Sequence, residues 1–152
     1  MPCNGGHMYG GCNCNTRGLK SKIDKLTRML CYLCGYLTEK NLMGKVGSEQ
    51  IQAWWKDHTS SDFDRVLHQM IDYSKKAIKK GPLDAESVAD HFINKALKVH
   101  DVSNFHKKWF LSMAKLAIGE TKEIHNMNEE KKKIRRKALK KLSKEEKTAL
   151  GL

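Results

Sequence analysis

Apolar side chains recur along residues 19–37 at alternating intervals of four and three positions. This spacing places them on one continuous stripe of a helix, which consists of Leu19, Ile23, Leu26, Leu30, Leu33 and Leu37. The segment NLMGKVGS, with two glycines, follows the stripe and is expected to end the helix. The pattern predicts one long N-terminal helix and leaves open whether its stripe joins two copies of the chain.

Helix start and stop signals divide the next part of the chain into shorter segments. The segment KKGPLD carries basic residues, a glycine and a proline in the order typical of a helix end. No stretch alternates apolar and polar residues with period two, so no strand is expected. The pattern predicts an all-α protein of five or six short helices around one core. The expected boundary residues are Ser48, Ser60 or Ser61, Asp84 and Ser103 as N-caps and Gly119 as a helix end.

The C-terminal part differs in composition from the rest. In KKKIRRKALKK, residues 131–141, eight of eleven positions are Lys or Arg, and the spacing of Ser143 and Glu146 is that of a capping box. We therefore expect a glycine-rich Cys/His arm over residues 1–17, a helical core over 18–119 and a basic C-terminal helical tail over 120–152.

Charge narrows the class of partner. The 152 residues include 29 basic and 17 acidic side chains, for a net charge of +12. Such a chain attracts polyanions, with nucleic acid first and an anionic membrane or an acidic protein surface second. The expected nucleic-acid-binding residues are Lys131, Lys132, Lys133, Arg135, Arg136, Lys137, Lys140 and Lys141. The alternative is a solvated helix with Ile134 and Leu142 docked on the core.

Two observations bear on the compartment and on membranes. The sequence has no apolar run of 18 residues and no secretion-signal pattern at its start, so an intracellular, cytoplasmic protein is expected. The apolar stripe of the basic tail is thin and lacks Trp or Phe, so membrane binding ranks last and no membrane partner is expected.

Five cysteines suggest a metal site. Cys12 and Cys14 form a C-x-C, and Cys31 and Cys34 form a C-x-x-C within the first long helix. Four thiolates suit tetrahedral zinc, with Cys3 and His7 as alternative ligands, and such a clamp would order the glycine-rich arm. The alternative is that Cys31 and Cys34 are buried core residues without metal. The sequence alone does not decide between a zinc site and plain core packing of these cysteines.

Other candidate residues carry less information. Adjacent Trp54 and Trp55 cannot both face one core, so one is expected inside and the other is a candidate partner-binding platform, unless the tail or the arm covers it. The histidines form no H-E-x-x-H motif and no paired H-x-T or H-x-S motifs of a phosphoesterase. The polar segment DHTSSD is explained by helix capping, and a second metal site at His100, Asp101 and His106 is a weaker alternative.

Three segments resemble a family of short bacteriophage and prophage proteins of unknown role. They are LTRMLCYLCGYL, IQAWWKDHTSSD and KALKKLSKEEKTALGL, which match the family's Leu-Cys-x-x-Cys, Trp-Trp-x-x-His and C-terminal basic-helix features. The resemblance covers roughly residues 26–62 and 127–152, and the block from 63 to about 125 resembles an insertion. It implies phage origin and helical character only, since the family has no assigned activity. A phage source would in turn favour a binding role toward a host factor, in the host cytoplasm.

These observations favour binding over catalysis. The first hypothesis is a small basic helical protein, zinc-stapled or not, that acts on nucleic acid or a nucleic-acid-associated complex. The second is a protein–protein adaptor or an inhibitor of a host factor without nucleic-acid contact. The third is a metal-dependent hydrolase, which requires an open metal position.

Overall fold

The structure, a computed structural model, describes residues 16–151, which form six helices joined by loops and contain no strand. Its elements are α1 (Thr16–Glu39), α2 (Met43–Val46), α3 (Glu49–Ala77), α4 (Ala85–Leu97), α5 (Asn104–Lys141) and α6 (Lys144–Ala149). The expected all-α class and the expected number of helices are thereby confirmed. The helices are not all short, however, because α1, α3 and α5 have 24, 29 and 38 residues.

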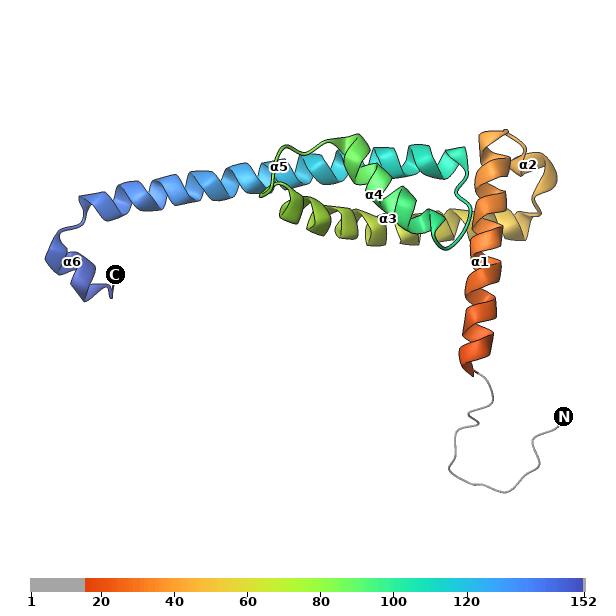
Figure 1. Ribbon diagram of the computed structural model, residues 1–152, viewed down its shortest axis with the longest axis horizontal. Helices are drawn as coiled ribbons and strands as arrows, with labels where there is room; N and C mark the ends of the chain where they lie inside the picture. Colours follow the sequence, from red (N-terminus) through yellow and green to blue (C-terminus); the bar gives the residue numbers. More distant parts are fainter. Residues whose placement is uncertain (1–15, 152) are drawn as a thin grey trace, which may run out of the picture.

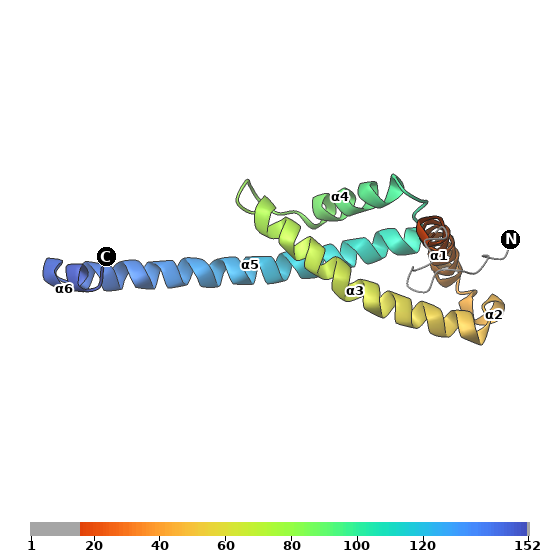
Figure 2. The same cartoon turned by 90° about the horizontal axis from the view of Figure 1, so that it is seen from below.

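The hydrophobic core lies between α3, α4 and the first half of α5 (Figures 1 and 2). Its largest fully buried side chains are Met70 of α3 and Met113 of α5, packed with Val88 of α4. Small residues, Ala114 and Ala117, let the neighbouring helices approach α5 closely. This three-helix body is the platform from which the remaining helices project.

The break expected at Ser60 or Ser61 is wrong, because α3 continues through both residues. The hydroxyl groups of Thr59 and Ser60 donate to the carbonyl oxygens of Trp55 and Lys56 within the same helix, instead of capping a new one. Such bonds to a preceding turn satisfy the hydroxyl groups inside a helix, so a polar segment alone does not mark an end. The caps expected at Ser48, Asp84 and Ser103 are present.

The end expected at Gly119 is also wrong, since α5 continues for another 22 residues to Lys141. A glycine within a helix costs about 1 kcal/mol relative to alanine, which the good helix formers around it outweigh. Gly119 lies on an exposed face where a β-carbon would meet nothing within 4 Å. The boundary expected between the helical core (18–119) and the basic tail (120–152) therefore falls inside one continuous helix.

Helix α1 stands across the end of the body opposite to the C-terminal part of α5 (Figure 1). Its last turns contact α5, whereas its first turns extend past the body. The helix ends where Asn41 adopts a left-handed conformation with φ of 55°, so the break in NLMGKVGS is made by this asparagine, while Gly44 lies inside α2.

The C-terminal half of α5 leaves the body as a single straight helix (Figures 1 and 2). Thr121 is the last buried residue of α5, and the 20 positions that follow extend it by about 30 Å at 1.5 Å per residue. A complete capping box of Ser143 and Glu146 starts α6, as expected from their spacing. Within residues 16–151, no helix is long and apolar enough to cross a membrane.

Candidate functional site

The segment from Lys131 to Lys141, called the basic rod below, is the most strongly charged surface of the described chain. All eight of its Lys and Arg side chains are exposed. At 100° per residue, six of them lie within one half of the helix circumference. These six form a double row with one pair of cations per turn, Lys132 with Lys133, Arg136 with Lys137 and Lys140 with Lys141.

One cation of this double row already has an anionic partner. Lys132 Nζ lies 2.8 Å from Glu129 Oε1, and this hydrogen bond holds the pKa of Glu129 below its ordinary value. Both side chains are exposed, so the pair adds little to stability. No other Lys or Arg within the basic rod forms an ion pair among residues 16–151. Five cations of the double row therefore remain available for an external anion.

The apolar residues of the basic rod do not anchor it to the core. Ile134 is 62% exposed, which contradicts the alternative in which this side chain docks on the body. Leu142, the C-cap of α5, is half-buried at the turn into α6. The helix stays extended because its cations repel one another and its apolar stripe is too thin to fold back.

More lysines lie where the C-terminal half of α5 leaves the body. Lys75, Lys76 and Lys79, near the end of α3, line a shallow hollow together with Ile124 and His125 of α5. The cationic surface therefore begins at the body and continues toward the basic rod.

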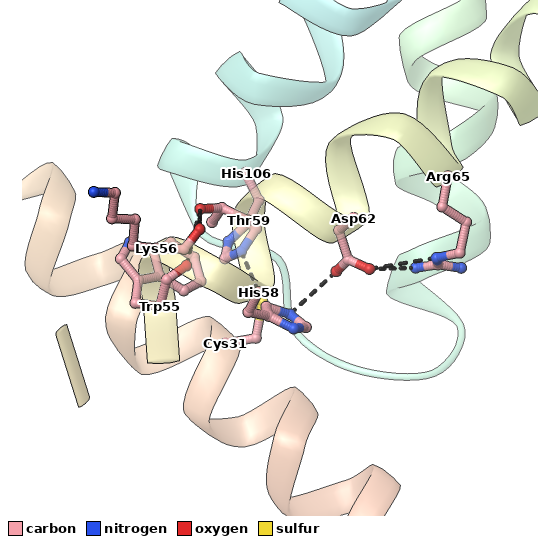
Figure 3. Close-up of polar contacts among 8 residues, drawn as sticks. All are labelled: Cys31, Trp55, Lys56, His58, Thr59, Asp62, Arg65 and His106. Atoms are coloured by element: carbon pink, nitrogen blue, oxygen red, sulfur yellow. Dashed lines mark hydrogen bonds and ion pairs between the residues drawn. The ribbon is translucent and has the colours of Figure 1, made fainter. Parts of the chain in front are cut away.

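A second cluster of polar side chains lies at the other end of the body, where α1 crosses α3 and α5 (Figure 3). Sγ of Cys31 lies 3.1 Å from Nε2 of His106, and Nδ1 of the same ring lies 2.5 Å from Oγ of Ser103. Ser103 is also the N-cap of α5 and accepts from the backbone N–H of His106. The imidazole thus links a thiol of α1 to the first turn of α5.

Burial sets the charge state of this link. Burial, with smaller contributions from Asp62 and Cys34, raises the pKa of the Cys31 thiol to about 12. Burial, with smaller contributions from the neighbouring His100 and His58, lowers the pKa of His106 to about 4. At neutral pH both groups are uncharged, and a neutral thiol is a poor nucleophile and a poor metal ligand. The pair is suited to holding α1 on the body.

An ion-pair chain runs beside this link along α3 (Figure 3). Asp62 lies 3.1 Å from Nε2 of His58 and 2.9 Å from Nη2 of Arg65. These groups and Cys31 border a cleft of about 580 Å³ between α1, α3, α4 and α5, with Arg28 and Lys95 at its edge. The carboxylate of Asp62 already has two partners, His58 and Arg65. Arg28, Lys95 and His100, which also line the cleft, have no side-chain hydrogen bond or ion pair with another group of residues 16–151.

The expected zinc site is only partly inside the described chain. Cys3, His7, Cys12 and Cys14 lie outside residues 16–151. Cys31 contacts His106, whereas Cys34, one turn on, is 1% exposed and burial raises its pKa. Within residues 16–151, no three His, Cys, Asp or Glu side chains are arranged to hold a metal ion. Of the residues considered for a second metal site, His100 and His106 both line the cleft, whereas Asp101 is not among its lining residues.

The two adjacent tryptophans lie in different environments, as expected for neighbouring positions on a helix. Trp55 is buried against Phe105 and His106 of α5, with ring centroids 5.7 and 5.8 Å apart. Trp54 is half-buried and stacks on His58, one turn further along α3, at a centroid distance of 4.6 Å. His58, a neighbour in the same helix, therefore covers one face of Trp54. The tail lies at the opposite end of the molecule (Figure 1), and the arm, the other covering group considered, lies outside residues 16–151.

Sequence reasoning missed the link between Cys31 and His106 because the two residues are 75 positions apart. The sequence did contain a weak signal. Ser103 is a typical N-cap residue, and His106 is the third residue after it, where a side chain lies close to the cap. No protein-family model matches the chain, and neither does any curated protein or solved structure.

Proposed function

We propose that the protein binds nucleic acid through the basic rod, in a mode that reads phosphate charge and not base sequence. The observation that carries the proposal is the double row of cations on a helix that leaves the body and is open to solvent. Phosphate contacts by Lys and Arg release condensed counterions, which favours binding to any duplex.

The geometry of the double row suits a polyanion. Successive pairs of cations are four residues apart, so they recur about every 6 Å along the helix axis. A duplex carries one negative charge about every 1.7 Å of its axis, and a helix of this diameter fits its major groove.

Salt dependence gives the sharpest test. With five available cations, the expected slope of log K against log salt is about −4.5, so affinity falls about 500-fold between 50 and 200 mM KCl. The measurement is fluorescence anisotropy of a labelled duplex of random sequence, titrated with the full chain in reducing buffer. A second duplex of different sequence should give the same affinity within about threefold.

A matched pair of variants assigns the binding to the basic rod. The test variant replaces four of its cations, Arg136, Lys137, Lys140 and Lys141, by Gln, and the expected slope falls to about −1. The control replaces four exposed lysines of the body, Lys56, Lys98, Lys107 and Lys115, by Gln. It removes the same charge and should keep a slope near −4.5. A flat salt response, or equal loss in both variants, would refute the proposal and favour a protein adaptor.

A further inference from the structure

The apolar stripe of α1 is not part of the hydrophobic core. Leu19, Ile23, Leu26 and Leu33 are 56, 59, 64 and 51% exposed, and Met29 beside them is 60% exposed. The side of α1 that contacts the body carries Cys31, Cys34 and Gly35 instead. Leu30 and Leu37, the other two leucines of the stripe, are half-buried. His100 and Asp101 border a shallow hollow beside Leu26 and Leu33. Most of the stripe is nevertheless exposed to solvent within residues 16–151.

We infer that this stripe pairs with the same stripe of a second copy of the chain. Its alternating four- and three-residue spacing runs from Leu19 to Leu37, and this is the repeat of helices that interlock side by side. A helix that served only to close its own body would place these leucines against that body. The 4–3 repeat on the solvent side of α1 therefore specifies a helix as the occupant.

The available area is sufficient for a symmetric pair. The five exposed residues present on the order of 500 Å² per copy, so a pair would bury about 1,000 Å², the lower limit for a specific interface. Their positions start in the first turns of α1, which extend past the body, so two copies can approach without contact between their bodies (Figures 1 and 2).

Charge distinguishes a second copy from an acidic partner helix. Lys20 and Lys22 flank the stripe, and Asp24 is the only acidic residue in the first three turns of α1. Two identical helices therefore repel weakly through these lysines. Added salt screens this repulsion and strengthens the pair, whereas salt would weaken binding of an acidic helix. Added salt therefore strengthens this dimer, whereas it weakens the binding of nucleic acid.

The test is sedimentation equilibrium of the nuclease-treated full chain in reducing buffer, at 100 and 500 mM NaCl. We expect a dimer whose dissociation constant decreases at the higher salt. Substituting Leu26→Glu together with Leu33→Glu should give a monomer at the same concentration. The control, Leu116→Glu with Leu150→Glu, changes two leucines of matched exposure, 50 and 63%, and should leave the dimer intact.

Folding is checked on the same samples. All four leucines are exposed, and Glu is a good helix former, so circular dichroism should show unchanged helix content in both variants. A chain that stays monomeric at both salt concentrations overturns the inference, as does equal dissociation in test and control variants. A dimer that weakens with salt would also overturn it. Each outcome is independent of whether the basic rod binds nucleic acid.

Discussion

Acid should weaken the attachment of α1 through His106, and the size of the effect follows from its surroundings. The ring has a pKa of about 4 in the folded protein, against 6.5 as its ordinary value, because it is buried near His100 and His58. The unfolded chain therefore binds this proton first as the pH falls. The stability that depends on neutral His106 is complete above pH 6.5 and decreases as the pH falls toward 4.

The magnitude can be worked out for pH 5. There the unfolded ring is almost fully protonated and the folded ring is about one-tenth protonated, which corresponds to about 2 kcal/mol at 1.36 kcal/mol per pKa unit. The ring keeps some contact with solvent, and screening reduces the expected loss between pH 8 and pH 5 to about 1–2 kcal/mol.

The assay compares urea unfolding of the wild type and of His106→Gln at pH 8 and pH 5, followed by circular dichroism. The variant loses contacts with Cys31 and Ser103, so its absolute stability is lower at both pH values. Only the difference between the two pH values tests the reasoning, because His100, whose pKa burial also lowers, titrates in both proteins. If both proteins lose the same stability between pH 8 and pH 5, or if NMR shows His106 titrating near pH 6.5, the account is refuted.

Three further substitutions test the packing. At Gly35 a β-carbon would lie 2.7 Å from Nδ1 of His106 and from Oγ of Ser103, so Gly35→Ala should lower the free energy of unfolding by about 1–3 kcal/mol, measured by urea denaturation. Gly119→Ala meets no neighbour within 4 Å and should raise it by about 0.5–1 kcal/mol; a decrease would show that the helix is not continuous there. Oγ of Ser74 is buried without a hydrogen-bond partner among residues 16–151, so Ser74→Ala should raise the thermal midpoint, with a gain on the order of 1 kcal/mol; an unchanged or lower midpoint would indicate a bound water.

Local signals predicted the helices but not how they join. The caps at Ser48, Asp84 and Ser103 were predicted because capping depends on a few neighbouring residues. The continuity of α5 through Gly119 was not, since a helix tolerates one poor residue when its neighbours supply the free energy. The same reasoning failed at Ser60, whose hydroxyl group bonds within its own helix.

The periodic stripe of α1 predicted a helix correctly and said nothing about what it would contact. A 4–3 repeat describes a face, and the same face can meet its own core or another chain. Leu26 at 64% exposure shows that here the core was built by other residues. The contact of Cys31 with His106 depends on how α1 crosses α5, which no local pattern encodes.

The departure of α5 from the body has a consequence for the order in which the protein melts. Beyond Thr121, turns of this helix are held by their own backbone bonds, and like charges four residues apart, such as Lys133 with Lys137, each weaken it by about 0.2–0.5 kcal/mol. Amide hydrogens of this stretch should exchange with solvent far sooner than those around Met113. Warming should therefore shorten α5 from its far end while the three-helix body is still intact.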